Sequence, residues 1–283
     1  MVKVGLVAEG GGTKAAYTAG VLKCFIEHDI PISYTVGISA ASEMLCAFVS
    51  KQKDRLELIA VDASCQKGIV GIKPFFKEGN VFALEQLADY IDSHIPLDTE
   101  TLYNSDTEMD TGLYNMETHE VEYFDKTYIK EDHELIKASC ALLILCKPRK
   151  FLGKTYTDAG LKEMICIGRS VEKGCDKHIV ISTKEEGYVR KPAPSYQLAL
   201  ANLLYHDKVI TEDLKRRHER YNEQWALVNQ LKEEGKALVL RPTKDLGVTR
   251  YTTDPVKLRP WFQLGYDETL ERIDEIRKFI EES

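Results

Sequence analysis

A serine follows a short apolar segment in the stretch Val36-Gly37-Ile38-Ser39-Ala40-Ala41-Ser42. The residues before it read as a buried strand, and those from Ala41 to about Lys51 read as a helix. A serine on a tight turn from strand to helix exposes its hydroxyl, and the free N–H groups of the helix stabilise negative charge beside it. The small residues Gly37 and Ala41 suit a close crossing of strand and helix. The pattern indicates a nucleophile, although ordinary turns also fit it.

Two further stretches have residue types suited to catalysis. Gly10-Gly11-Gly12 lies between a predicted strand over 2–8 and a predicted helix over 15–28, so its amides can converge on an anion. Asp158 ends a short predicted strand over 154–157. In a parallel sheet the carboxyl ends of the strands share one edge, where ligands bind. We therefore expect the glycines, Ser39 and Asp158 to meet at that edge.

These stretches resemble the three motifs of the patatin-like phospholipase family, G-G-G-x-[RK]-G, G-x-S-x-G and D-G-[GA]. They occur here as Gly10-Gly11-Gly12-Thr13-Lys14-Ala15, Gly37-Ile38-Ser39-Ala40-Ala41 and Asp158-Ala159-Gly160. Ala138-Ser139-Cys140-Ala141 is similar to the A-S-x-A of the family. The resemblance covers about residues 2–185. Residues from Thr211 onwards are similar to the C-terminal extension of a bacterial branch of the family.

What the resemblance implies is a catalytic dyad. Ser39 would be the nucleophile that forms an acyl-enzyme, and Asp158 the base that takes its proton and later activates water. The backbone N–H groups of the implied oxyanion hole belong to Gly10, Gly11, Gly12 and Ala40. The residues that support the turns are Gly37, Ala41, Ala159, Gly160 and Lys14. The expected reaction is hydrolysis of a lipid, phospholipid or other carboxylic ester, with no metal and no cofactor.

The sequence departs from these motifs by alanine in place of glycine at Ala15, Ala41 and Ala159. Ala15 begins a helix, where alanine is favourable, and Ala41 adds one methyl group at the strand–helix crossing. If position 159 requires a positive φ, alanine costs about 1–2 kcal/mol and re-aims Asp158. The alternative function is therefore a catalytically weakened relative that binds acyl ligands or a protein partner.

Other sites fit the sequence less well. Gly10-x-Gly12-x-x-Ala15 also matches a dinucleotide-binding fingerprint, but Ile38-Ser39 stands where that motif needs an acid. Lys14 lacks the Ser/Thr of a Walker A loop. His178 and His206 are candidates for the base of a Ser-His-Asp triad, yet each reads more simply as a structural or surface histidine. The spacing of the histidines indicates no metal site.

The elements that position these residues predict an α/β fold of three layers, with a mainly parallel central sheet and helices on both faces. Residues 1–190 form the predicted acyl hydrolase domain. Residues 195–283 form a helical extension with one strand over 237–241, packed on the same domain. An antiparallel pair is expected over 111–116 and 119–124. A terminal helix over 267–281 should turn inward Leu270, Ile273, Ile276 and Ile280.

The distribution of charge limits the kinds of partner that the protein can bind. A net charge of −7 over 283 residues argues against a nucleic-acid binder. The run over 215–220 reads as a solvated helix face, and the acidic cluster over 106–110 as a solvated loop. The expected partner is a lipid or acyl-ester substrate, and the oligomeric state stays open. Lys73-Pro74-Phe75-Phe76-Lys77 suits either a buried wall of the site or transient contact with an anionic membrane surface.

The seven cysteines are odd in number and scattered, without a C-x-x-C pair. This arrangement is typical of reduced thiols rather than of a disulfide framework or a zinc site. The first residues read directly as a strand, so we expect no signal peptide. The predicted location is the cytoplasm.

Overall fold

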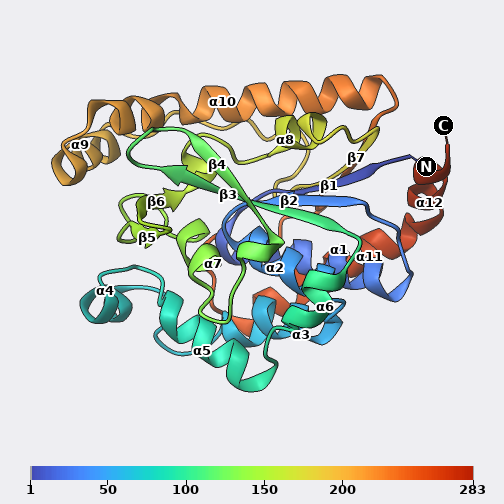
Figure 1. The fold of residues 1–283 in the computed structure, drawn as a ribbon, viewed down its shortest axis with the longest axis horizontal. Helices are drawn as coiled ribbons and strands as arrows, with labels where there is room; N and C mark the ends of the chain where they lie inside the picture. Colours follow the sequence, from blue (N-terminus) through green and yellow to red (C-terminus); the bar gives the residue numbers. More distant parts are fainter. Residues whose placement is uncertain (1, 283) are drawn as a thin grey trace.

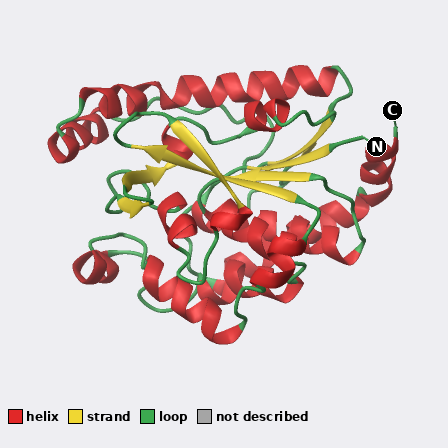
Figure 2. Cartoon of the chain, in the orientation of Figure 1, coloured by secondary structure: helices red, strands yellow, loops and turns green. Residues whose placement is uncertain are grey.

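A central sheet lies between two layers of helices in the computed structural model, which describes residues 2–282 apart from the side chains of Ile72, Phe75 and Glu78 (Figures 1 and 2). The strand order is β5-β6-β3-β2-β1-β7-β8, and β4 also pairs with β3. Five neighbouring strands of this order pair in parallel, namely β3, β2, β1, β7 and β8. The predicted three-layer α/β fold is confirmed.

The strands are β1 (Val4–Ala8), β2 (Tyr34–Gly37), β3 (Glu108–Asn115), β4 (Val121–Asp125), β5 (Arg149–Phe151), β6 (Lys154–Asp158), β7 (Lys177–Ile181) and β8 (Ala237–Leu240). The helices are α1 (Ala16–Glu27), α2 (Ala40–Val49), α3 (Lys53–Glu57), α4 (Ile72–Glu78), α5 (Leu84–His94), α6 (Thr99–Asn104), α7 (Glu134–Ser139), α8 (Ile167–Glu172), α9 (Ser195–Tyr205), α10 (Lys208–Glu233), α11 (Pro255–Glu271) and α12 (Ile273–Glu281). Shorter helical segments are η1 (Gly12–Ala15), η2 (Leu58–Ala63), η3 (Lys126–Tyr128) and η4 (Ala159–Leu161).

The central strands are apolar because both of their faces are covered. In β1, Leu6 and Ala8 belong to one core cluster together with side chains of α1, α2 and α11. Val7 belongs to a second cluster, which includes Tyr221 and Val228 of α10. Figure 1 shows α10 and α8 on one side of the sheet and α1, α2 and α11 on the other. An uninterrupted apolar strand is what such double coverage requires.

The long strand β3 changes its partner along one edge. Its residues 108–111 pair with β2 in parallel, and its residues 113–115 pair with β6 antiparallel, while β4 takes the opposite edge. The carboxyl ends of β2 and β6 therefore point at each other across Gly112. The expectation that Asp158 follows a parallel strand is wrong. It approaches Ser39 because β6 runs in the reverse direction and lies farther along β3.

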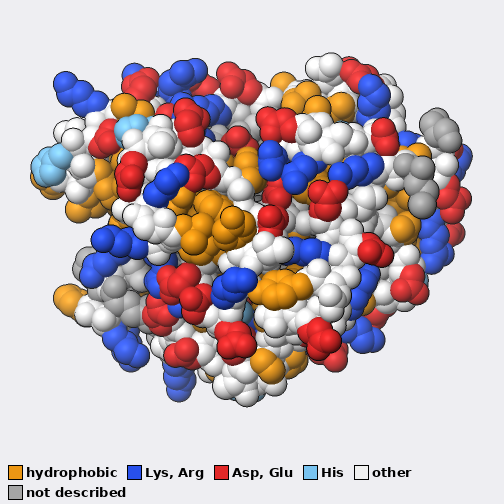
Figure 3. Space-filling view, in the orientation of Figure 1, with side chains coloured by type: hydrophobic (Ala, Val, Ile, Leu, Met, Phe, Trp, Pro, Cys, Tyr) orange, Lys and Arg blue, Asp and Glu red, His pale blue; other side chains and the backbone are white. Residues whose placement is uncertain are grey.

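The acidic cluster over 106–110 is a solvated loop only at its start, where Asp106 is exposed and precedes the strand. Strand β3 begins at Glu108, three residues before the predicted start, and therefore includes Asp110. Asp110 is only 2% exposed, lies 2.8 Å from Arg169 Nε and accepts a hydrogen bond from the hydroxyl of Tyr34. The predicted antiparallel pair is confirmed as β3 and β4. The face drawn in Figure 3 shows acidic and basic side chains interspersed.

The C-terminal residues complete both the sheet and a helical layer. Strand β8 pairs with β7 in parallel, and α11 packs against α1. The predicted terminal helix is instead the end of α11 followed by α12. Leu270 is 39% exposed, so its predicted inward position is wrong, whereas Ile276 and Ile280 are buried. Trp261 and Phe262 lie on the buried face of α11. Near the end of the helix this face includes Thr269 rather than Leu270.

Helices α1 and α11 approach each other almost backbone to backbone. A Cβ atom on Gly20 would lie 2.0 Å from the carbonyl oxygen of Phe262. A Cβ atom on Gly265 would lie 2.2 Å from the carbonyl oxygen of Tyr17. Two glycines, one on each helix, therefore allow this contact.

The Gly20→Ala variant is expected to lower the free energy of unfolding by about 3 kcal/mol, because its methyl group must push the two helices apart. Urea unfolding measures the change. Gly168→Ala in α8 is the matched control, since nothing lies within 4 Å of its added Cβ atom. A loss of similar size in both variants would contradict the close packing.

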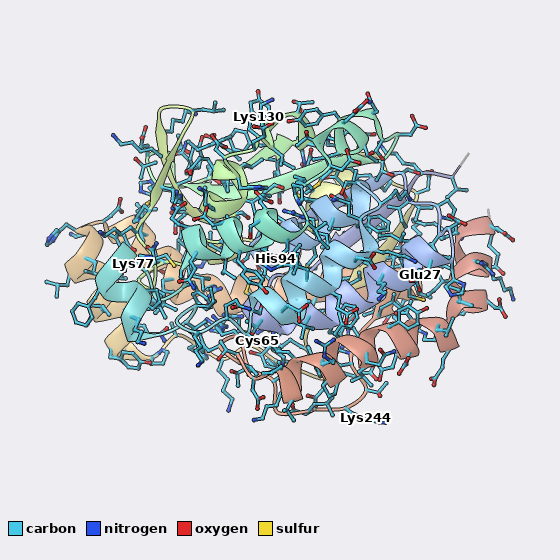
Figure 4. The ribbon with its side chains drawn as sticks, turned by 90° about the horizontal axis from the view of Figure 1, so that it is seen from below. Glu27, Cys65, Lys77, His94, Lys130 and Lys244 are labelled. Atoms are coloured by element: carbon cyan, nitrogen blue, oxygen red, sulfur yellow. The ribbon has the colours of Figure 1, made fainter. Side chains whose placement is uncertain are left out.

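Helix α4 contains the segment from Lys73 to Lys77. Figure 4 shows α4, with Lys77 labelled, at one end of the molecule and far from Glu27. Phe76 is 83% exposed, so the interpretation of this residue as part of a buried wall is wrong, although Pro74 is buried.

Within residues 2–282, no helix has both the length and the apolar character to cross a membrane.

Candidate active site

The turn after β2 holds Ser39 in an uncommon backbone conformation. Its φ is 56° and its ψ is −141°, and the residue is 7% exposed. Positive φ in a residue other than glycine costs on the order of 1–3 kcal/mol and is often found at functional sites. Helix α2 begins at the next residue, Ala40. A Cβ atom on Gly37 would lie 2.8 Å from Leu45 and 3.3 Å from the Cβ of Ala41, which explains the small residues here.

The segment Ala138–Ala141 positions both Ser39 and Asp158. The backbone N–H of Ser39 donates a hydrogen bond of 2.8 Å to Ser139 Oγ, which in turn donates to the carbonyl of Gly112. The backbone N–H of Asp158 donates to the carbonyl of Ala141 over 2.9 Å. Sequence reasoning noticed this segment only as a resemblance, without a physical role. Ser139 is therefore a positioning residue that it missed.

The Asp158 carboxyl group is 3% exposed and accepts a hydrogen bond of 2.7 Å from the N–H of Gly160. Burial raises the pKa of Asp158 above its usual value. The hydrogen bond from Gly160, the Ser39 side chain and the charges of Arg217 and Arg250 oppose that rise but do not cancel it. A raised pKa makes a carboxylate a better proton acceptor near neutral pH.

The glycine loop presents free donors. Among the described residues, no hydrogen bond uses the N–H groups of Gly10, Gly11, Gly12 or Ala40. Gly12 has a φ of +57°, and a Cβ atom there would lie 2.6 Å from the carbonyl oxygen of Arg250. That same carbonyl accepts a hydrogen bond from the N–H of Thr13. The Lys14 ammonium lies 5.3 Å from the ring centroid of Trp261 and so supports the loop from outside the site.

The alanines that replace motif glycines are accommodated. Ala159 does not have a positive φ, so its methyl group causes no strain of that kind. It is fully buried at the start of η4. The demanding position is the next one, because a Cβ atom on Gly160 would lie 2.9 Å from the carboxylate oxygen of Asp158 that its N–H binds. The turn needs its glycine at 160 and not at 159.

Ser39 lies between two cavities. The first, here called the apolar cavity, has a volume of about 110 Å³, and the apolar side chains that line it include Ala16, Met44, Ile59, Leu87, Ile136 and Leu142. The second, here called the polar cavity, is lined by Ser39, Asp158 and all three glycines, and also by Lys184, Arg217 and Arg250. The structure therefore brings together the residues that the three motifs predict, and it adds three cations that sequence reasoning missed.

Arg217 belongs to the charged run over 215–220, which is not uniformly solvated. Lys215, Arg216 and Glu219 are exposed, whereas Arg217 lines the polar cavity. The helical spacing contains the signal, since Arg217 lies seven residues after the buried Ile210 and four before the buried Tyr221. Neither histidine candidate lines these cavities. His178 hydrogen-bonds Ser170 over 2.8 Å, and burial lowers its pKa to about 4.

Two family models match this chain. Patatin-like phospholipase matches residues 6–168, and a domain of unknown function (DUF6363) matches residues 208–281. Uncharacterized protein YjjU of Escherichia coli (strain K12) is 26% identical over 187 residues, which are 64% of this chain and 52% of that protein. The chain thus spans about half the length of this curated relative.

A solved structure has a similar fold. VipD from Legionella pneumophila aligns with a TM-score of 0.52 and 13% sequence identity, over 97% of this chain and 67% of that one. At this identity the likeness concerns the fold alone. The match to the first family model, by contrast, extends over more than half of the chain and includes the glycine loop, Ser39 and Asp158. The chain therefore belongs to the patatin-like phospholipase family, a family of lipid hydrolases.

Proposed function

We propose that this protein hydrolyses carboxylic esters of acyl chains, with Ser39 as the nucleophile and Asp158 as the general base. The observation that supports this most is the polar cavity, which gathers Ser39, Asp158 and the glycine loop in one place. The glycine N–H groups there have no other acceptor among the described residues. A nucleophile, a base and unpaired donors are the parts that acyl transfer requires.

In the proposed reaction Asp158 accepts the hydroxyl proton of Ser39 while Oγ attacks the ester carbonyl carbon. The carbonyl oxygen becomes negative and takes hydrogen bonds from the N–H groups of Gly11, Gly12 and Ala40. Asp158 then returns the proton to the departing alcohol, which leaves an acyl group on Oγ. Asp158 next takes a proton from a water molecule as the water attacks the acyl carbon. It returns that proton to Oγ as the bond from Oγ to the acyl group breaks, and the acid is released. Loss of one oxyanion donor typically costs about 3–4 kcal/mol of transition-state stabilisation.

The apolar cavity suits the acyl chain of the substrate, because Ser39 and Ala40 lie at its wall. A lipid is therefore the proposed substrate class. The exposed residues Lys73, Phe76 and Lys77 of α4 support a transient contact with an anionic membrane surface. All seven cysteines are free, which favours a reducing compartment such as the cytoplasm. We further propose that residues 195–283 work as one unit with residues 1–190, since both contribute to the polar cavity.

A fluorophosphonate probe tests the proposed nucleophile, because it phosphonylates only an activated serine hydroxyl. We expect a single adduct, found by mass spectrometry on the peptide that contains Ser39. Ser195→Ala removes an exposed serine and is the control, so its labelling should equal that of the wild type. Absence of an adduct, together with no turnover of p-nitrophenyl esters of graded chain length, would favour the weakened acyl-binding relative.

The Gly160→Ala variant is expected to lower kcat by about 100-fold, since displacement of a reacting group by about 1 Å costs this much. The added methyl group would crowd the carboxylate oxygen of Asp158. Ala159→Gly is the matched variant, and its kcat should stay within about threefold of the wild type. Steady-state hydrolysis of a p-nitrophenyl ester measures both. Equal losses would show that position 160 does not orient the base.

A further inference from the structure

The C-terminal part of the chain reaches the glycine loop from both faces of the sheet. Residues 208–281, which match the domain of unknown function and are here called the C-terminal region, include α10, the edge strand β8 and α11. Helix α10 lies on one face of the sheet and α11 on the other (Figure 1). Tyr221 of α10 and Trp261 of α11 are buried, and each donates a hydrogen bond to a residue within the stretch over 9–14.

Glu9 immediately precedes the glycines and is completely buried. Its Oε2 atom accepts hydrogen bonds from Ser182 Oγ over 2.7 Å and from the N–H of Thr183 over 2.8 Å. Its Oε1 atom accepts one from the hydroxyl of Tyr221 over 2.9 Å and lies 3.9 Å from Lys184 Nζ. A buried carboxylate that lost these donors would be left unpaired, which is costly. The side chain of Glu9 therefore fixes the start of the glycine loop to the end of β7 and to α10.

The end of the loop is fixed by backbone and indole contacts. Trp261 Nε1 donates a hydrogen bond of 2.9 Å to the carbonyl of Lys14. The hydroxyl of Thr13 donates to the carbonyl of Thr249 over 3.0 Å, and its N–H donates to the carbonyl of Arg250 over 3.3 Å. All three partners belong to the C-terminal region. One region thus holds the glycine loop at both of its ends.

The glycines themselves do not supply this order. An oxyanion hole stabilises a transition state only when its N–H groups point at the developing charge before the reaction begins. The N–H groups of Gly10, Gly11 and Gly12 have no acceptor among the described residues, so hydrogen bonds of their own do not orient them. Glycine also has more conformational freedom than any other residue. The contacts on either side of the glycines must therefore fix the loop.

We propose that the C-terminal region positions the glycine loop for catalysis, with Glu9 and Tyr221 as positioning residues at the start of the loop and Trp261 at its end. This role rests on the proposed function, and it gives the domain of unknown function a task in the same reaction. Neither Tyr221 nor Trp261 lines the apolar cavity or the polar cavity. Their effect on the reaction is therefore exerted through the loop.

The Tyr221→Phe variant tests the start of the loop, because it removes only the hydroxyl that binds Glu9. We expect kcat for a p-nitrophenyl ester to fall about tenfold and KM to change less than about twofold, since the loop acts on the transition state. Tyr266→Phe is the matched control. Tyr266 also belongs to the C-terminal region and donates to a glutamate, Glu27, over 2.7 Å, but at the opposite end of α1 from the loop. Equal losses of kcat in the two variants would overturn the proposal.

An alkyl trifluoromethyl ketone separates a misplaced loop from a partly unfolded protein. In the proposed site Ser39 Oγ bonds to the ketone carbon, the hydroxyl proton passes to Asp158, and the ketone oxygen becomes an oxyanion that mimics the transition state. The inhibition constant Ki should rise about tenfold in Tyr221→Phe and stay unchanged in Tyr266→Phe. A smaller folded fraction lowers kcat but leaves Ki as it is, so that result in Tyr221→Phe would contradict a positioning role.

Two further variants keep the test decisive. Trp261→Phe removes the indole N–H at the other end of the loop, and its kcat should fall as its Ki rises, which serves if Tyr221→Phe does not fold. Glu9→Gln combined with Tyr221→Phe should lose no more than about twofold beyond the larger single loss, because both changes weaken one hydrogen bond. Fully additive losses would show that the two residues do not act as a unit. A wild type that the ketone does not inhibit, together with undiminished hydrolysis by Ser39→Ala, would instead refute the proposed function.

Discussion

The Ser39→Ala variant is expected to hydrolyse esters with a kcat at least about 10⁴-fold lower than that of the wild type. It should not be labelled by a fluorophosphonate. Alanine lacks the oxygen on which the acyl group is carried, and none of the other residues that line the polar cavity has a hydroxyl group. Residual turnover would come from the free N–H groups and from binding alone. Rates at saturating p-nitrophenyl ester, with the intact mass after exposure to the probe, measure both losses.

A second substitution at this position separates chemistry from folding. Ser39→Gly should be equally inactive but more stable than Ser39→Ala by about 1 kcal/mol, because glycine adopts a φ of 56° without strain. Urea unfolding of the two variants gives the difference. Equal stability would mean that the turn does not store strain at Ser39. Activity above about a tenth of the wild type in either variant would exclude Ser39 as the nucleophile.

The parts of this fold that could be predicted are those that local sequence determines. Gly37 and Ala41 suit a close strand–helix crossing, and the glycine loop follows a short apolar strand, so both turns were expected where they occur. Pairing between distant strands is not local. The sequence of β6 does not encode its direction, which depends on how β3 exchanges β2 for β6 along one edge. The approach of Asp158 to Ser39 was therefore expected for the wrong geometric reason.

The cations of the site were missed for a different reason. A run of charged residues in a helix usually faces water, and most of the run over 215–220 does so. Arg217 differs only in its phase relative to Ile210 and Tyr221, which a periodicity count over the whole helix would have shown. Lys184 and Arg250 lie in loops, where no periodicity exists. Only the folded chain brings them beside Ser39.

The Asp158→Asn variant is expected to lower kcat by about 10³-fold or more, since general base catalysis typically contributes 10²–10⁴-fold and asparagine accepts no proton. It nearly preserves the shape of the side chain, and its amide oxygen can still accept the hydrogen bond from Gly160. The profile of kcat/KM against pH should show an acid limb in the wild type at a pH above the ordinary pKa of an aspartate, because burial raises the pKa of Asp158. The residual activity of the variant should lack this limb.

The same substitution should make the protein more stable at neutral pH. Because the folded pKa of Asp158 is raised, the native state binds more protons than the unfolded state between the two pKa values, so stability falls as the pH rises through that window. Above the window the buried carboxylate is charged at full cost, and asparagine removes that cost. The stability advantage of Asp158→Asn should therefore shrink as the pH is lowered, when the native aspartate becomes neutral. Thermal unfolding of both proteins across this pH range measures the trend. A variant that is less stable at neutral pH, or active without its carboxylate, would show that Asp158 is held for structure and not as the base.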